Sequence, residues 1–531
     1  MSAPERGPLT THYAPQGMVC SPDHLASATG VALLRAGGTA ADAAVGASAV
    51  LAVTTPHMCG MGGDLFALVH DGPGPPVALN ASGRAGSGAD LERLRREGHP
   101  TMPFTGDIRS VPVPGCVDGW LALHEAQGRL PLAEVLGPAI GYAVDGFVVG
   151  SLLAAMAPVV AGRRGAEDFG SRSAPIQAGQ RCRRPGVGAS LRAIVASGRA
   201  GFYQGEFGTG LMALGGGEFT AGDLARSQAD WVPPLGRRLW DHDVWTMPPN
   251  SQGYLVLAAG LVAEGLDLPA DPDDPAWAHL LIESARQAGY DRPEVLHEHA
   301  DPDDLVDPAR LAARRRAIDP LRAGTRAVPD ADGGTIFLCA VDGERRGVSL
   351  IQSNASGFGS LLFEPNTGIN LHNRGLGFSV ETGHPAAYGP GRRPPHTLSP
   401  TLVTTPDGRL KATVGAMGGD AQPQIVLQLL ARLLAADQAP ANVVHAPRFV
   451  LANHAGGRGF DTWASDGELG VDLEADAPAG WFDGLAQRGH DVRRVPSANH
   501  AMGHAHIIAV LDDGLGGGAD RRAGSGGAVG L

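Results

Sequence analysis

The residues with the clearest chemical potential lie at 332–335, where two glycines precede a threonine in Asp332-Gly333-Gly334-Thr335. A threonine hydroxyl is a weak nucleophile until a neighbouring base accepts its proton. If the peptide bond before Thr335 is cut, the freed α-amine becomes that base, with a pKa of roughly 8. Gly334 on the leaving side lets the backbone reach the strained geometry of an N-to-O acyl shift. The alternative reading is an ordinary glycine-rich turn.

A second glycine-rich segment runs from Gly415 through Met417, Gly418 and Gly419 to Asp420, between an expected strand and an expected helix. The backbone N–H groups of its adjacent glycines are candidates to stabilise a tetrahedral oxyanion. A plain strand-to-helix turn is the alternative. The segment is not a phosphate-binding loop, because no Lys-Ser or Lys-Thr follows it.

A third segment, residues 391–401, combines Pro394 and Pro395 with the polar pair His396-Thr397. It is either a proline-stiffened loop or a rigid strip that presents polar groups to a substrate. Other chemistry has little support. There is no G-x-S-x-G elbow, residues 60–63 do not match a dinucleotide fingerprint, and His504 with His506 lacks the spacing of a zinc hydrolase. We therefore expect no metal and no organic cofactor.

Composition limits the classes of protein to which the chain can belong. The 531 residues carry a formal net charge of −13, which disfavours a nucleic-acid partner. No apolar run is long enough to span a membrane, and residues 1–16 lack an apolar signal segment, so we expect a cytoplasmic protein. The five cysteines are widely spaced, which argues against a disulfide scaffold.

The elements that must position these residues follow from periodicity and capping. Ser21-Pro22 predicts the start of a helix that runs to Arg35 and stops at Gly37-Gly38, and Thr39 with Asp42 predicts a capping box. Apolar runs predict a buried hairpin over 335–341 and 348–352. Further predicted elements are helices at 40–53, 119–126, 132–145, 253–264, 278–288 and 424–435, strands at 65–69, 398–405 and 410–414, a solvated helix and linker at 301–326, and a disordered glycine-rich tail at 514–531.

Taken together, these segments resemble the γ-glutamyltransferase family from residue 17 to about residue 508. The family's motifs occur in order, and one alone would be weak evidence. They are Gly17-Met18-Val19, Ala36-Gly37-Gly38, Asp42-Ala43-Ala44-Val45, Gly60-Met61-Gly62-Gly63, Val113-Pro114-Gly115, Asp145-Gly146-Phe147, residues 247–253, Glu283 with Ala285-Arg286, Asp291-Arg292, Gly334-Thr335 up to Asp342, Ser399-Pro400-Thr401, Gly418-Gly419 and Ala446-Pro447-Arg448.

The resemblance implies an α+β fold, the N-terminal-nucleophile αββα sandwich of two stacked antiparallel sheets flanked by helices. It implies a precursor that cuts itself between Gly334 and Thr335 into a large subunit, residues 1–334, and a small subunit, residues 335–531, which form a heterodimer. Thr335 then carries the nucleophile, and Gly418 with Gly419 stabilises the oxyanion. Ser353 falls where the family has a threonine that supports the nucleophile, and Asn354 lies one residue from the family's asparagine.

The chain also departs from the family at named positions. Typical members carry Thr and His where Ile336 and Phe337 stand. His396 and Thr397 fill the slot of two serines, and Gly377, three residues after Arg374, fills the slot of the carboxylate that grips the substrate's α-amine. We expect Arg84, the approximate counterpart of the family's carboxylate-binding arginine, to contact the substrate together with Arg374, His396 and Thr397. Residues 352–359 look more like the subgroup of γ-glutamyltransferase-like proteins and glutaryl-cephalosporin-type acylases.

The leading hypothesis is therefore amide acyl transfer through an acyl-Thr335 intermediate. The donor would be a γ-glutamyl compound such as glutathione or a related acyl amide, and water or an amine would resolve the intermediate. Two alternatives stay open at this point. One is an acylase for glutaryl-type or other non-amino acyl amides, and the other is a catalytically silent member that kept the fold.

Overall fold

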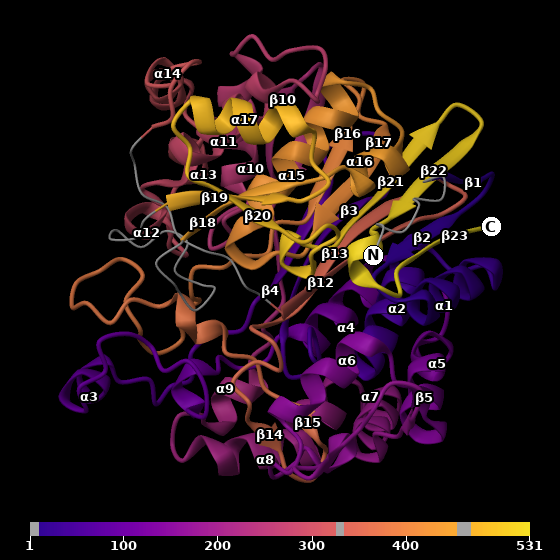
Figure 1. Cartoon of the computed structure of the whole chain (residues 1–531). Coiled ribbons are helices and arrows are strands. Elements are labelled where there is room, and N and C mark those ends of the chain that lie inside the picture. The colour runs from indigo at the N-terminus through magenta and orange to yellow at the C-terminus, as the bar shows by residue number, and fades with distance from the viewer. Residues whose placement is uncertain (1–9, 325–333, 454–468) are drawn as a thin grey trace.

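The computed structural model describes residues 10–324, 334–453 and 469–531. Within them, two seven-stranded antiparallel sheets pack against each other (Figure 1). The first sheet has the order β1 (His12–Ala14), β22 (Gly514–Ala519), β21 (Ala505–Leu511), β17 (Leu410–Ala416), β16 (Thr401–Thr404), β11 (His242–Thr246), β10 (Leu235–Leu239). The second has the order β23 (Gly527–Gly530), β2 (Met18–Ser21), β12 (Gly334–Val341), β13 (Gly347–Ala355), β3 (Asp64–His70), β4 (Val77–Ala81), β9 (Asp230–Val232).

Helices cover the outer face of each sheet. Over the second sheet lie α1 (His24–Arg35), α2 (Ala40–Thr54), α4 (Cys116–Gln127), α5 (Leu132–Asp145) and α7 (Pro185–Tyr203). Over the first lie α10 (Tyr254–Glu264), α11 (Pro275–Gly289), α15 (Gln422–Leu430) and α16 (Pro440–His445), with α17 (Ala479–Gln487) against α11. The predicted αββα sandwich is thus the observed layering, and the predicted α+β class is confirmed (Figure 1).

Shorter elements complete the described chain. They are α3 (Leu91–Arg96), β5 (Phe147–Val148), α6 (Ser151–Met156), β6 (Gly170–Ser171), β7 (Ala174–Pro175), β8 (Arg181–Cys182), α8 (Glu206–Gly215), α9 (Ala221–Ala225), α12 (Arg292–Val295), α13 (Pro302–Leu305), α14 (Pro308–Arg316), β14 (Phe363–Glu364), β15 (Ile369–Asn370), β18 (Phe449–Asn453), β19 (Leu469–Glu474) and β20 (Val492–Val495). None of the described helices combines the length and apolarity that crossing a membrane would require.

Strand β12 shows how the sequence fills both sides of a sheet. Ile336 and Leu338 enter the core beneath the helices, whereas Phe337 and Cys339 enter the core between the two sheets. Successive side chains of a strand point to opposite faces, so a strand buried on both faces reads as a continuous apolar run. By the same alternation Thr335 shares the face of Phe337, which is the space between the sheets.

Most predicted elements are confirmed, including the hairpin of β12 and β13 and the capping box of Thr39 and Asp42. The first helix differs at its start. Asp23, not Ser21, is the N-cap, because its carboxylate accepts the N–H of Leu25 at 2.8 Å. The Ser21 hydroxyl instead lies 2.7 Å from the hydroxyl of Ser27. All five cysteines are free and buried, in line with the prediction that they form no disulfide scaffold.

The predicted disorder of residues 514–531 is wrong. This segment forms β22 and β23, which pair with β1, β21 and β2. Its glycines serve close packing: a Cβ on Gly517 would lie 2.2 Å from the sulfur of Met18. Composition alone misled the prediction, because a strand that needs small residues on a crowded face has the same glycine content as a disordered tail.

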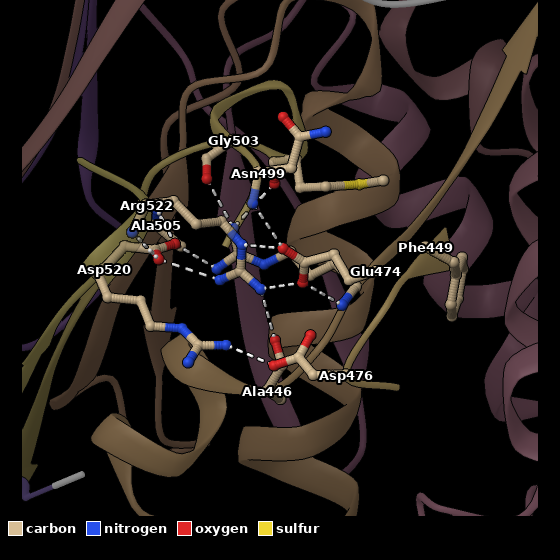
Figure 2. A network of polar contacts seen from close by, with 12 residues as sticks. Ala446, Phe449, Glu474, Asp476, Asn499, Gly503, Ala505, Asp520 and Arg522 are labelled. Carbon is tan, nitrogen blue, oxygen red and sulfur yellow. Dashed lines mark hydrogen bonds and ion pairs between the residues drawn. The ribbon is translucent and has the colours of Figure 1, made fainter. Parts of the chain in front are cut away.

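Buried charges also hold this C-terminal segment in place (Figure 2). The Arg522 guanidinium donates to Glu474 at 2.9 Å and to Asp520 at 3.0 Å, and one of its N–H groups reaches the carbonyl of Ala446 at 2.9 Å. Asp520 also accepts from Arg448 at 2.6 Å. Each buried charge therefore has an opposite charge and hydrogen bonds, which is the condition for burying it at all.

The proposed division at residues 334 and 335 does not separate two bodies in space. Each sheet contains strands from both sides of it: β12 pairs with β2, which precedes the division, and β16 pairs with β11, which also precedes it. The two products of a cut there would share both sheets and remain associated through them. Gly333 lies outside the described residues, and the register of β12 against β13 shifts between Gly334 and Thr335.

Candidate active site

Three polar residues form one row across the second sheet, on three neighbouring strands. Thr335 of β12 pairs with Ser353 of β13, and Ser353 pairs with Asp64 of β3. All three are fully buried. The Thr335 Oγ1 and the Ser353 Oγ lie 2.9 Å apart, within hydrogen-bond distance. The register of the sheet therefore places the expected nucleophile beside the residue expected to support it.

Arg374 links this row to the strip that carries Thr397. Its Nε donates to Asp64 at 2.8 Å, its Nη2 to the Ser353 hydroxyl at 2.9 Å and its Nη1 to the Thr397 hydroxyl at 2.8 Å. The guanidinium is planar and its donors have fixed directions, so three simultaneous bonds leave it little freedom. The Ser353 hydroxyl oxygen also accepts the backbone N–H of Ala355 at 2.8 Å.

The carboxylate of Asp64 also contacts two histidine rings. His396 Nε2 lies 2.9 Å from Asp64 Oδ2 and His372 Nδ1 lies 3.3 Å from it. Burial would raise the pKa of Asp64, but the charge of Arg374 and the contacts with both histidines hold that pKa well below its usual range. Burial, with the nearby Arg374 charge, lowers the pKa of His396 to about 3, so this ring is neutral near pH 7.

Neutral His396 has a defined tautomer. Its Nδ1 accepts the N–H of Leu398 at 3.2 Å, so its Nε2 carries the proton and donates to Asp64. The ring is fully buried behind Asp64 and does not line the cavity described below. Its place is thus in the wall of the site, whereas the sequence suggested a contact with substrate.

The glycine pair lies at the turn between β17 and α15. Gly418 has φ 152° and Gly419 has φ 52°, both in the region that favours glycine. Within the described part of the chain, neither backbone N–H donates a hydrogen bond, whereas the Gly419 carbonyl accepts from Gln252 Nε2 at 3.1 Å. The same Gln252 nitrogen donates to the Thr397 carbonyl at 3.0 Å and so ties the turn to the strip. Two unused N–H groups fit an oxyanion-binding role.

Asn354 lies on the other side of the strand from Ser353. Its Nδ2 donates to the carbonyl of Pro56 at 3.0 Å, and its backbone N–H donates to Met58 at 3.2 Å. No contact between Asn354 and Thr335 is among those found in the described residues. The asparagine therefore supports the segment at 56–58, one residue out of step with the position that the resemblance suggested.

A cavity of about 340 Å³ opens beside this cluster. Arg374, Thr397 and Ala355 line it on the side of the nucleophile, and Asp420 lines it next to the glycine pair. Arg292 also lines the cavity and pairs with Asp420 at 3.4 Å. Thr335, Ser353, Gly418 and Gly419 are not themselves among the lining residues: Ser353 reaches the cavity wall through Arg374, and the glycine turn borders it through Asp420.

Gly377 also lines the cavity, but it cannot carry a carboxylate in this backbone. A Cβ built there would lie 2.3 Å from the carbonyl oxygen of Pro395, far inside van der Waals contact. The absence of an acidic side chain at this position is therefore fixed by packing as well as by sequence.

Arg84 is held away from the cavity. Its Nη2 donates to Asp230 at 2.5 Å, and Asp230 also pairs with Arg393 at 2.9 Å. Arg84 is not among the residues that line the cavity. Of the four expected substrate contacts, the structure brings Arg374 and Thr397 to the cavity, and it places Arg84 and His396 elsewhere.

One group among the described residues could offer ligands to a metal ion: His279, Glu283 and His490. The rings of the two histidines are joined by a contact of 2.8 Å between Nδ1 of His279 and Nε2 of His490, which is a hydrogen-bond distance. Glu283 is paired with Arg286 at 3.1 Å. These contacts account for the group as a polar network between α11 and the segment before β20.

Comparison with known proteins assigns the chain to a family. The gamma-glutamyltranspeptidase family matches residues 26–530. The chain belongs to this family.

Individual relatives match almost the whole chain. It is 34% identical to the oxamate amidohydrolase proenzyme of Klebsiella pneumoniae, with 95% of this chain and 97% of that protein covered. It is also 34% identical to the glutathione hydrolase-like YwrD proenzyme of Bacillus subtilis, with 97% and 98% covered. A cephalosporin acylase from Bacillus halodurans superposes with a TM-score of 0.90 at 31% identity, covering 100% of this chain and 98% of that one.

Membership confirms the fold and the general activity. The chain is a γ-glutamyltransferase-type amidohydrolase with the N-terminal-nucleophile fold. Relatives are named as glutathione hydrolase, oxamate amidohydrolase and acylase. The names of several relatives include the word proenzyme, which fits a processed two-subunit form.

Sequence reasoning missed Asp64 and His372. A weak signal for Asp64 was available: a carboxylate opens a buried strand directly after Gly62-Gly63. Buried carboxylates are rare unless they are paired, so the sequence itself indicates that Asp64 has a partner. His372 had no such signal, because only the fold brings it to Asp64.

Proposed function

We propose that this family member matures by cutting the bond between Gly334 and Thr335 and then cleaves amides through an ester on Thr335. In maturation the Thr335 hydroxyl attacks the carbonyl carbon of Gly334 and the acyl group moves from nitrogen to oxygen. Water then hydrolyses the ester, which releases the Gly334 carboxylate and the Thr335 α-amine. The contact of 2.9 Å between Thr335 Oγ1 and Ser353 Oγ is the observation that carries this proposal.

In the catalytic cycle the α-amine of Thr335 accepts the hydroxyl proton while the oxygen attacks the donor's carbonyl carbon. The backbone N–H groups of Gly418 and Gly419 would receive the developing oxyanion. The amine leaves with the proton returned from the α-ammonium, and an acyl ester remains on Thr335. Water or a second amine then attacks this ester and frees the enzyme. No step requires a metal or an organic cofactor.

The donor is a γ-glutamyl amide such as glutathione or a related acyl amide. A second candidate, an acylase that needs no α-amino group on its donor, is favoured by the packing at Gly377, which leaves no room for the carboxylate that would bind an ammonium. Both candidates use the same nucleophile and differ in the donor that the cavity accepts.

Intact mass spectrometry of the purified protein, together with the variant Thr335→Ala, tests the proposal. The wild type should give two fragments, the smaller beginning Thr-Ile-Phe-Leu, and should hydrolyse at least one of a panel of γ-glutamyl and glutaryl anilides. The variant should remain one chain, show no turnover and keep a wild-type circular dichroism spectrum. Turnover by an uncut chain, or by the variant, would place the nucleophile elsewhere.

A further inference from the structure

Asp64 occupies a position that the proposed chemistry does not use directly. It lies in the same sheet row as Thr335 with Ser353 between them, and it is fully buried. Burying a carboxylate costs free energy unless opposite charges and hydrogen bonds offset the loss of hydration. Here the partners are Arg374, His396 and His372, all within 3.3 Å of Asp64 Oδ2.

We infer that Asp64 is a positioning residue for the reaction of Thr335, acting through Arg374 and Ser353. This inference rests on the proposed function of Thr335. The ion pair with Asp64 sets the rotation of the guanidinium, because it engages Nε at 2.8 Å. With Nε fixed, the planar group directs Nη2 to Ser353 and Nη1 to Thr397.

The consequence reaches the nucleophile in one further contact. The Ser353 hydroxyl receives N–H groups from Arg374 and from the backbone of Ala355, and it lies 2.9 Å from Thr335 Oγ1. An error in the angle of the guanidinium would shift the serine hydroxyl and with it the hydroxyl that must attack. A misplacement of about 1 Å at a reacting group costs on the order of a hundredfold in rate.

His396 also holds the Asp64 carboxylate, from the strip that leads into β16 of the first sheet. Its neutral ring donates Nε2–H to Asp64 and accepts the N–H of Leu398 at Nδ1. The carboxylate on β3 is thereby held by groups from two other segments of the chain: His372 and Arg374 from one, and His396 from the strip that precedes β16. The strip also carries Thr397, so the same carboxylate fixes one wall of the cavity.

Elsewhere the fold contains a matched ion pair with no link to Thr335. Asp118 is almost fully buried, pairs with Arg199 at 2.8 Å and accepts the backbone N–H of Gln228 at 2.7 Å. If Asp64 served only to stabilise the fold, replacing either aspartate by asparagine would have the same kind of effect. A positioning role predicts that the two variants differ.

The test compares Asp64→Asn with Asp118→Asn, using the cleaved, folded fraction of each protein and the best anilide donor of the wild type. We expect kcat of Asp64→Asn to fall by about tenfold to a hundredfold while KM stays within about threefold. Asp118→Asn should lower Tm but leave kcat per cleaved enzyme within about twofold. Self-cleavage of Asp64→Asn, followed by intact mass, should slow in parallel because it uses the same hydroxyl.

Arg374→Lys provides a second route if Asp64→Asn does not fold. A lysine keeps the charge next to Asp64 but cannot bridge Ser353 and Thr397 at once, so kcat should fall as it does in Asp64→Asn. The double variant Asp64→Asn/Arg374→Lys should lose little more than either single one, since both act through one contact.

A kcat of either single variant within about twofold of wild type, or an equal loss in Asp118→Asn, would overturn the inference. Failure of the proposed function looks different. In that case Thr335→Ala would retain turnover, whatever the behaviour of the Asp64 variants.

Discussion

Thr335 of β12 and Asp64 of β3 lie in one cross-strand row of the second sheet, joined through Ser353. Asp64 precedes the proposed cut in the chain and Thr335 follows it, so each product contributes one end of this row. Strand pairing holds the nucleophile, on the first residue of one product, in register with its supporting carboxylate on the other product. The shared sheets therefore preserve the geometry of the site after the chain is cut.

The glycine turn should be sensitive to a single methyl group. Gly419 has φ 52°, so Gly419→Ala strains the backbone and displaces the N–H that is proposed to bind the oxyanion. We expect kcat/KM of the cleaved enzyme to fall by about a hundredfold. Gly98→Ala is the matched control: Gly98 has φ 83° with no atom within 4 Å of the added Cβ, and it lies in an exposed turn. Comparable losses in both variants would show that strain, not the oxyanion, explains the effect.

The α-amino group of the donor should matter little. A carboxylate that contacts a substrate ammonium contributes roughly 1.5–3 kcal/mol, and Gly377 offers none. We expect kcat/KM for γ-glutamyl and glutaryl anilides to lie within about tenfold of each other. A preference of a thousandfold for the γ-glutamyl donor would mean that another acidic residue, such as Asp420 at the same cavity, supplies the contact.

Gly377→Asp should not restore that recognition. The Cβ of any side chain there meets the Pro395 carbonyl at 2.3 Å, so the strip carrying Thr397 must move before a carboxylate can enter. We expect the variant to lose activity toward both donors instead of gaining selectivity, as measured by the ratio of the two kcat/KM values. A rise of that ratio by tenfold or more with retained activity would contradict this expectation.

Residues that belong to a local sequence pattern could be predicted from the sequence. Residues that reach the site only through the tertiary fold could not. Gly334-Thr335 and the apolar strands around them carried enough signal, because a nucleophile at the head of a buried strand is a local pattern. Arg374 and His396 were identified, but as substrate contacts, since nothing local reveals the carboxylate of Asp64 that holds them. The C-terminal strands were missed because small residues required by packing resemble disorder in composition.

The C-terminal segment should be essential for stability. Asp520 is buried and bonds Arg448, Arg522 and the backbone N–H of Ala505, the last at 2.9 Å (Figure 2). Asp520→Asn removes the carboxylate that Arg448 pairs with and leaves Glu474 to pair with Arg522, so the free energy of unfolding should fall by about 3–5 kcal/mol. Denaturant unfolding followed by circular dichroism measures this change. Asp512→Asn, at an exposed turn, should stay within about 0.5 kcal/mol of wild type. A small effect of Asp520→Asn would show that the network in Figure 2 is not stabilising.

Acid should destabilise the protein through buried neutral histidines. His506 is fully buried, and burial lowers the pKa of its ring to about 3 from the ordinary 6.5. Below pH 6.5 the unfolded chain binds a proton at His506 that the folded chain does not. The free energy of unfolding therefore falls as the pH drops from 6.5 toward 3, by about 2–3 kcal/mol between pH 6.5 and 4.5 for this one residue.

The variant His506→Phe isolates this contribution. Neither ring nitrogen of His506 has a hydrogen-bond partner in the described part of the chain, and the ring stacks on Phe337 at 6.1 Å between centroids. A phenyl ring keeps that stacking and removes the titrating group. We measure the free energy of unfolding by urea at several values from pH 4.5 to 7. The slope of this free energy against pH should decrease in His506→Phe, by an amount that corresponds to the uptake of up to one proton fewer on unfolding. An unaltered slope in His506→Phe would mean that the ring binds its proton equally in the folded and unfolded chain, and it would contradict the lowered pKa of His506.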